Sequence, residues 1–221
     1  MKTLLSILCS KKVKYAFILI ILLFIYISIC AFAYANAIST SLEDSVFRLH
    51  VLANSDSQED QNLKYKVRDA LIEYMNSLCK DVTSKQEAIL IAEENKNKFY
   101  EIAKDIISEN GYNYDVSVEI GNFSFPTKNY GDISLPSGYY DALRVKIGKA
   151  EGQNWWCVMF PPLCFVNVSS GIVPEDSKNN LKENLSDEEF SIISNENSSQ
   201  VKFKFKLIEF LNSVNILTAK K

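Results

Sequence analysis

Histidine is scarce in this 221-residue sequence, which contains only one, His50. Any Ser-His-Asp or Cys-His arrangement must therefore be centred on His50, with Ser55 or Cys157 as the candidate nucleophile. Neither candidate lies in a nucleophile elbow or a cysteine-protease signature. A histidine inside an alternating strand is more often structural than catalytic. We therefore expect that the chain is not an enzyme, and a hydrolase using His50 is the alternative.

Motifs for phosphates and metals are also missing. The seven glycines are scattered at turns and form no phosphate-binding loop. The cysteines and the single histidine do not readily supply the four ligands of a structural zinc site. We expect neither a cofactor nor a metal.

Arginine is rare. The part of the chain that follows the N-terminal segment contains only Arg48, Arg68 and Arg144. The first 37 residues hold four of the 24 Lys+Arg and none of the 27 Asp+Glu, so the remainder carries 20 against 27, a net charge of −7. Nucleic-acid binding depends on neutralising phosphates with basic side chains. The balance therefore argues against a nucleic-acid partner.

The sequence begins with the parts of an export signal. Four lysines precede an unbroken apolar run of 19 residues, Tyr15 to Ala33. Small-residue cleavage patterns follow, and they make Ala33, Ala35 and Ala37 the candidate cleavage positions. The run is also just long enough to span a bilayer, so a cleaved signal peptide and an uncleaved anchor both remain open. Either way, the basic flank stays inside and the rest of the chain crosses the membrane.

The five cysteines leave one redox question open. Cys9 and Cys30 lie in the export segment, which leaves an odd number outside it. Cys157 and Cys164 flank a Pro-Pro turn, so a local disulfide is sterically plausible in an exported protein. Free buried thiols are the equally weighted alternative.

Hydrophobic periodicity predicts one exported domain, residues 38–221, after the segment 1–37. A strand is expected over Val46 to Ala53, with Leu49 and Val51 on one face and Arg48 and His50 on the other. Two helices with one apolar face each should follow, the first running to about Lys80 and the second capped by Ser84 and running to Asn110. The short link between them makes them antiparallel neighbours.

The pattern then changes to period 2. Strands are expected around Val116–Ile120, Leu143–Ile147 and Trp155–Phe160, the last being continuously apolar and therefore central. Residues 169–200 are polar and acidic, which indicates a mobile loop with a short helix capped by Ser186. Residues 201–214 fit a helix that packs on the domain, or a membrane-surface helix. The predicted fold is an α+β two-layer domain, a mainly antiparallel sheet covered by two long antiparallel helices, plus a C-terminal helix.

The first strand and the following helix start carry the densest set of polar side chains. Asp60, Lys64 and Arg68 are spaced at i, i+4 and i+8, so an ion-paired helix face is the structural interpretation. The functional interpretation is a recognition patch for a protein partner. Its candidate contact residues are Arg48, His50, Asn54, Asp56, Asp60, Arg68 and Asp69.

Two long stretches resemble a known family. FRLHVLANSDSQEDQNLKYKVRDALIEYM and the later NWWCVMFPPLCFV are similar to the stage II sporulation protein R family of endospore-forming bacteria. The similarity includes the export segment and the terminal FKFK-x-x-EF element, whereas residues 175–199 show no such signature.

The resemblance implies an intercellular signalling role. Members of the family are made in the forespore and exported into the space between the forespore and mother-cell membranes. There they activate a membrane aspartic protease of the mother cell, which processes pro-sigma-E. The resemblance therefore predicts a released or membrane-tethered messenger with this protease as its partner, and it supplies no catalytic residues. A membrane-anchored structural protein is the remaining alternative.

Overall fold

The computed structural model describes residues 11–162 and 175–194. The chain divides into two units, Met1–Ile38 and Ser39–Lys221. Helix α2 (Lys11–Ser45) makes up the described part of the first unit and continues into the second. Its most apolar stretch is not buried, and the helix is long and apolar enough to cross a membrane. The helix continues past the apolar run, so the cleavage candidates Ala33, Ala35 and Ala37 lie within it.

A four-stranded mixed sheet forms the centre of the second unit. Its strands lie in the order β2 (Val116–Phe125), β5 (Gly138–Ile147), β1 (Phe47–Leu52) and β6 (Asn154–Phe160). Strand β1 is parallel to β5 and antiparallel to β6, and β2 is antiparallel to β5. Two of the three pairings are thus antiparallel, and the predicted α+β class with a mainly antiparallel sheet is confirmed.

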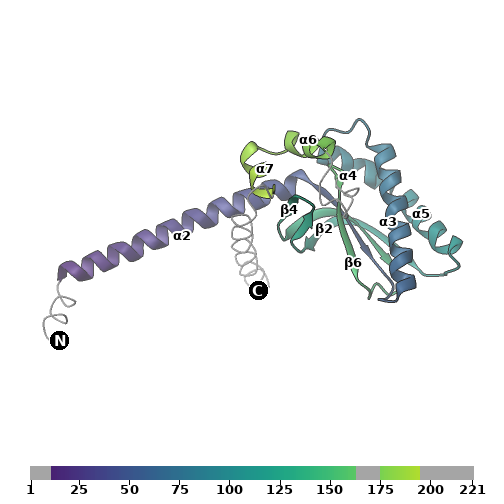
Figure 1. The fold of residues 1–221 in the computed structure, drawn as a ribbon, viewed down its shortest axis with the longest axis horizontal. Helices are drawn as coiled ribbons and strands as arrows, with labels where there is room; N and C mark the ends of the chain where they lie inside the picture. The colour runs from purple at the N-terminus through teal and green to yellow at the C-terminus, as the bar shows by residue number, and fades with distance from the viewer. Residues whose placement is uncertain (1–10, 163–174, 195–221) are drawn as a thin grey trace. The chain divides into compact units, whose positions relative to one another are not determined.

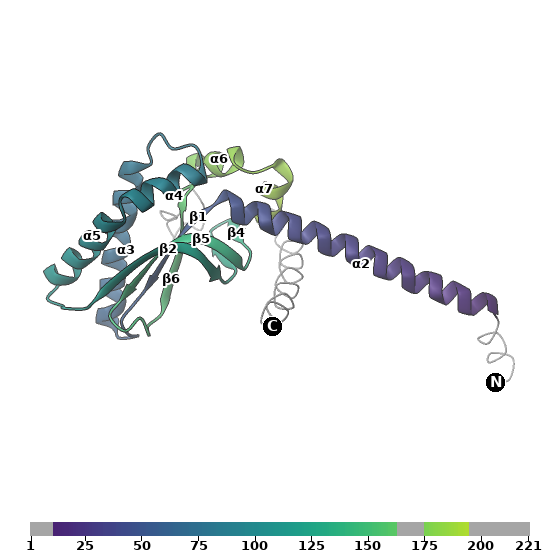
Figure 2. The ribbon, with the colours of Figure 1, turned by 180° about the vertical axis from the view of Figure 1, so that it is seen from behind.

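Three helices cover one face of this sheet (Figures 1 and 2). They are α3 (Gln58–Leu78), α4 (Lys85–Glu94) and α5 (Lys96–Glu109). Helices α3 and α5 are antiparallel, because Tyr74 late in α3 donates a hydrogen bond to Asn95 before α5, and Lys66 early in α3 donates one to Asn110 after it. The apolar side chains of β1 that face these helices are fully buried, as are those of α3 and α5 beneath them: Phe47, Leu49, Val51, Val67, Leu71, Phe99 and Ala103.

The second predicted helix is interrupted, which corrects the expectation of two long helices. Asn95 has φ −102° and ψ 12° and separates α4 from α5. Its side-chain amide donates to the carbonyl of Ile91 at 2.9 Å, and its side-chain oxygen accepts from Tyr74 at 2.8 Å. These bonds compete with the helical backbone pattern, as Asn side chains commonly do. The predicted cap at Ser84 is confirmed, since its hydroxyl accepts from the Glu87 amide.

Strand β6 is not central, contrary to the prediction from its apolar run. It forms one end of the sheet within the described residues. Its second half is nevertheless buried, from Cys157 to Phe160, because both faces of the sheet are covered at this end. The strand stops before Pro161, as predicted.

The second unit also contains a hairpin and two short helices. A hairpin of β3 (Lys128–Tyr130) and β4 (Ile133–Leu135), with Gly131 at φ 64°, was not predicted. The acidic stretch contains helices α6 (Glu175–Glu183) and α7 (Asp187–Ile193), and the cap at Ser186 is a complete capping box. The predicted C-terminal helix over 201–214 lies outside the described residues.

Candidate functional site

The loop after β1 is a hydrogen-bonded structure that we call the loop clasp, formed by residues 54–60 and the turn 148–153. Asp60 Oδ2 accepts hydrogen bonds from Asn54 Nδ2 at 2.8 Å and from Ser55 Oγ at 2.5 Å. The Asp60 amide in turn donates to Ser57 Oγ at 3.2 Å, which makes Ser57 the N-cap of α3. A carboxylate in the first turn also suits the helix dipole.

The loop clasp also holds the turn between β5 and β6. Asn54 Oδ1 accepts from the Lys149 amide at 3.0 Å, and Asp56 Oδ1 accepts from the Gln153 amide at 2.6 Å. Glycine is required in this turn, because a Cβ on Gly152 would overlap the backbone carbonyl of Ser55. Three of the predicted contact residues, Asn54, Asp56 and Asp60, therefore join two loops of the same domain.

Asp60 is the buried charge of the loop clasp, with 5% of its surface exposed. Burial by itself raises the pKa of Asp60, but hydrogen bonds from Ser55, Asn54 and Tyr114 outweigh it and hold the pKa below its usual value. The carboxylate is therefore ionised in the folded domain at neutral pH, and its partners are matched to that charge.

The predicted ion-paired face of α3 is not what the structure shows. Lys64 is buried, and its ammonium donates to Gln61 Oε1 at 2.5 Å and to the Gln153 carbonyl at 2.9 Å. Arg68 instead pairs with the adjacent Asp69 at 2.6 Å, where the Asp69 side chain is 64% exposed. The spacing was correct for a helix, but other partners, mostly close in the sequence, replaced the expected pairs along it.

Arg68 also lies against aromatic rings. Its guanidinium carbon is 4.2 Å from the centroid of Trp155 and 4.9 Å from that of Tyr65. The two rings themselves meet edge to face, 5.6 Å apart. Cation–π contacts of this kind fix the planar guanidinium against the side of β6.

Arg48 is fully buried in an aromatic cage on the sheet face away from the helices. Its guanidinium carbon lies 4.0 Å from the centroid of Phe125 and 4.6 Å from that of Tyr140. One nitrogen donates to the Tyr130 hydroxyl at 2.6 Å, while Nε and Nη1 have no hydrogen-bond partner among the described residues. The rings offset part of the cost of burying the charge. Arg48 thereby attaches the β3–β4 hairpin to the sheet.

His50 is the next residue on the same face and is 6% exposed. Its ring stacks on Trp156 with centroids 3.6 Å apart, and Nε2 is 3.0 Å from Asn154 Oδ1. Burial lowers the pKa of His50 to about 4, and the nearby charges of Arg144, Arg48 and Lys146 act in the same direction. The imidazole is therefore neutral at physiological pH.

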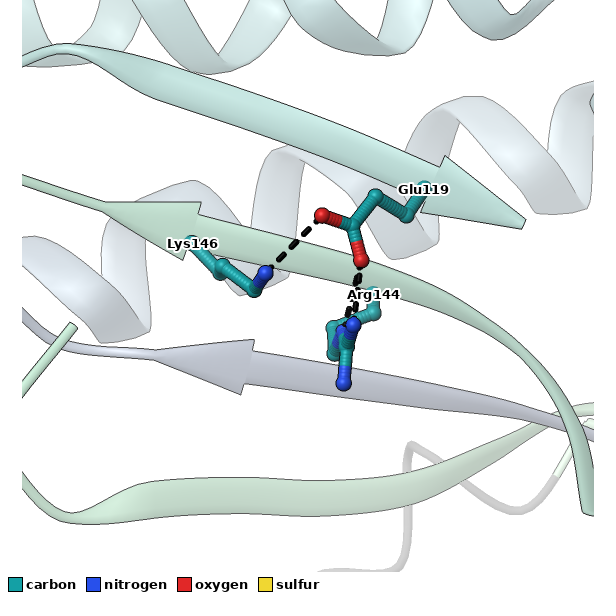
Figure 3. A network of polar contacts seen from close by, with 3 residues as sticks. All are labelled: Glu119, Arg144 and Lys146. Carbon is teal, nitrogen blue, oxygen red and sulfur yellow. Dashed lines mark hydrogen bonds and ion pairs between the residues drawn. The ribbon is translucent and has the colours of Figure 1, made fainter. Parts of the chain in front are cut away.

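A row of polar side chains crosses the sheet beside His50. The strand registers place Glu119 opposite Arg144, Arg144 opposite His50, and His50 opposite Trp156, one residue from each strand. Directly opposite residues share a face of the sheet. The charged side chains of this row point away from the helices, which lie behind the sheet in Figure 3.

Glu119 binds two cations, Arg144 in the row and Lys146 two residues further along β5. Its carboxylate accepts from Arg144 Nε at 3.0 Å and from the same guanidinium through Nη2, and from Lys146 Nζ at 2.8 Å (Figure 3). Hydrogen bonds from Lys146 and Arg144 lower the pKa of Glu119. The three side chains are 37%, 26% and 34% exposed for Glu119, Arg144 and Lys146 respectively. We call the exposed surface around them the open face; its residues are Glu119, Phe123, Arg144, Lys146, Asn154 and Trp156.

The geometry does not assemble a catalytic set around His50. Cys157 pairs with Leu49 in the register, so it lies on the helix face while His50 lies on the other. Cys157 is moreover disulfide-bonded. The Ser55 hydroxyl donates to Asp60 within the loop clasp. No group of three or more His, Cys, Asp and Glu that would hold a metal ion occurs in residues 11–162 and 175–194.

The predicted Cys157–Cys164 pairing stays a prediction, because Cys164 lies outside the described residues. A surface cavity of about 930 Å³ opens where the link between α3 and α4 meets the end of β6. Cys79 is among its lining residues, and burial raises the pKa of this thiol to about 11, so it is a poor nucleophile.

The structure therefore divides the seven predicted contact residues among three places. Asn54, Asp56 and Asp60 belong to the loop clasp, Arg48 and His50 lie buried beside the open face, and Arg68 and Asp69 lie on α3. Contact with a partner stays a prediction for all seven. The sequence analysis did not predict the open face. Its signal in the sequence is the alternation of Glu119, Arg144 and Lys146 with apolar residues. The sequence does not show that the two strands carrying these residues, β2 and β5, are neighbours in the sheet.

Comparisons with known proteins agree on one family. The family model described as "Stage II sporulation protein R" matches residues 43–170, which include the loop clasp and the open face. A protein of Bacillus subtilis (strain 168) named "Stage II sporulation protein R" is 42% identical over 130 residues. That match covers 59% of this chain and 58% of the relative. No solved structure matches the chain.

Proposed function

Because the chain belongs to the stage II sporulation protein R family, we propose that it is the exported messenger that activates pro-sigma-E processing during endospore formation. In this proposal the forespore makes the chain and exports its folded domain into the space between the two membranes. The domain there binds a membrane aspartic protease of the mother cell, which removes the pro-sequence of sigma-E. The family membership is the observation that carries the proposal.

The export segment supports the proposed route. Helix α2 is long and apolar enough to cross a membrane, and lysines precede its apolar run. The positive-inside rule then assigns the second unit to the far side. Cleavage near Ala33 to Ala37 would release the domain, whereas an intact helix would tether it. Both states permit signalling across a narrow gap between membranes.

The polar constellations support a binding role rather than hydrolysis. Within the described residues, the conspicuous polar groups serve structure, in the loop clasp, or form an exposed surface, the open face. A messenger that binds the active state of the protease better than the inactive state shifts the equilibrium by that difference in affinity. The mechanism requires no catalytic group on the messenger.

A reconstitution experiment tests the proposal. The protease, the pro-form of sigma-E and the full chain are expressed together in a non-sporulating host, and processing is followed by immunoblot. We expect processing only when all three are present, and none when residues 1–37 are deleted so that the domain stays in the cytosol. Equal processing with and without the chain would refute the proposal. Mass spectrometry of the exported chain then distinguishes a new N-terminus near Ala33 to Ala37 from an intact Met1.

A further inference from the structure

The open face has a charge opposite to that of its domain. Residues beyond the export segment carry a net charge of −7, from 20 Lys+Arg and 27 Asp+Glu. On the open face, Arg144 and Lys146 share a single carboxylate, Glu119, which leaves one positive charge in excess. The buried Arg48 on the same side of the sheet donates to the neutral Tyr130 hydroxyl and pairs with no carboxylate among the described residues, so its charge adds to that of the open face. A basic surface on an acidic protein selects acidic partners.

The open face also has the composition of a binding surface. Trp156 stacks on His50 and remains half-buried at the end of the row. Phe123 is half-buried and lies under the guanidinium of Arg144, whose carbon is 3.8 Å from the ring centroid. Tryptophan and arginine dominate the residues that carry binding energy at protein interfaces. The rings and the cations are held by backbone register and by each other, so little conformational entropy is lost on binding.

We propose that the open face binds an acidic segment of the partner protein, with a carboxylate on Arg144 and Lys146 and apolar side chains on Trp156 and Phe123. This inference rests on the proposed function, because it names the messenger surface that contacts the protease. Arg144 and Lys146 together carry one positive charge more than Glu119 balances, so they can accept a second carboxylate, and the neighbouring rings receive the apolar part of the same segment. A symmetric pairing of two open faces is a poor alternative, because it would bring like charges together.

Two substitutions in one network separate recognition from structure. Arg144→Gln and Glu119→Gln break the same hydrogen-bonded network, so a purely structural network predicts a similar loss for both. Recognition of an acidic segment predicts opposite results, because the first lowers the positive charge of the open face and the second raises it. Lys98→Gln is the matched control: Lys98 lies on α5, is 52% exposed and pairs with Glu101. Lys146→Gln replaces Arg144→Gln if the latter fails to fold.

The test measures binding of the purified full-length chain to the purified full-length protease, both in detergent, at low and high salt, together with processing in the reconstituted host. We expect Arg144→Gln to weaken binding about tenfold, as loss of a charged interface contact commonly does. Glu119→Gln should bind as tightly as the wild type or more tightly, and Lys98→Gln should not change binding. The wild-type affinity should fall as salt is raised.

Each remaining outcome is decisive. Equal weakening by Arg144→Gln and Glu119→Gln, or no weakening by Arg144→Gln and Lys146→Gln, overturns the inference while the wild type still activates processing. Self-association of the chain that Arg144→Gln abolishes also overturns it, because the occupant would then be a second copy. A wild-type chain that neither binds nor activates the protease instead refutes the proposed function, and the inference with it.

Discussion

The substitution Asp60→Asn tests whether the loop clasp stabilises the domain. The change keeps the size of the side chain but removes the charge that accepts from Asn54 and Ser55. A hydrogen bond to a charged group contributes about 1.5–3 kcal/mol and a neutral one about 0.5–1.5 kcal/mol, so two weakened bonds lose about 2–3 kcal/mol. Loss of the charge in the first turn of α3 removes about 0.3–1 kcal/mol more. The expected decrease in unfolding free energy is therefore about 3 kcal/mol.

Urea unfolding of the full chain in detergent measures this decrease. Both tryptophans of the sequence, Trp155 and Trp156, lie on β6, so their fluorescence reports on the second unit and not on the apolar helix. At neutral pH the midpoint should fall by about 1–2 M, given the usual urea dependence of small domains. In a thermal scan the midpoint should fall by about 6–12 °C.

Asp69→Asn is the matched control for this measurement. Asp69 is 64% exposed and pairs only across the surface with Arg68, so its loss should cost less than about 1 kcal/mol. The pKa of Asp60 is lowered in the folded state, so its contribution is present above the unfolded pKa and is lost as pH falls through the folded pKa. The difference between wild type and Asp60→Asn should therefore shrink in acid. Equal urea midpoints for Asp60→Asn and Asp69→Asn at neutral pH would show that the loop clasp does not stabilise the domain.

Three further predictions concern other groups. The pKa of His50 is lowered from 6.5 to about 4, so folding favours the neutral imidazole. The unfolding free energy of the wild type should therefore fall by about 3 kcal/mol as pH drops from above 6.5 to about 4. Urea titrations of His50→Gln should show a smaller decrease over the same pH range. The raised pKa of Cys79 predicts alkylation at pH 8 on the order of a hundred times slower than for an ordinary thiol, and mass spectrometry of the Cys79 peptide should show a large acceleration in urea. Gly152→Ala should lower the unfolding free energy by more than about 2 kcal/mol, because its Cβ meets the Ser55 carbonyl, whereas Gly121→Ala meets only the flexible Phe123 ring and should cost less.

Local patterns were sufficient to predict most elements of the second unit. The alternation in Phe47–Leu52 and the apolar stripe of α3 appear in the structure within a few residues of the predicted bounds. The caps at Ser84 and Ser186 were also predictable, because a capping serine and the residues it accepts from lie within one turn. The interruption at Asn95 was not, since apolar residues continue at helical spacing on both sides and the bond from Tyr74 is tertiary.

Strand order was the information that local patterns lacked. A continuously apolar strand is buried on both faces, and sequence reasoning placed Trp155–Phe160 in the centre for that reason. The structure places β6 at one end and buries its second half by other means. The prediction of an exposed patch at Arg48 and His50 had the same origin. Alternation assigned them to the polar face, but the aromatic residues that bury them come from distant segments: Phe125, Tyr130, Tyr140 and Trp156.

The part of the resemblance that follows β1 and the proposed recognition surface lie in different parts of the domain. The stretch that carries the resemblance after β1 forms the loop clasp, whose side chains satisfy one another and the turn 148–153. The row of Glu119, Arg144, His50 and Trp156 beside the open face is instead built from single residues of four strands, which the insertion of β1 between β5 and β6 brings together. The row exists only when the sheet is complete, and the loop clasp holds the β5–β6 turn that positions two of those strands. In the proposed recognition, the loop clasp therefore acts through the geometry of the sheet.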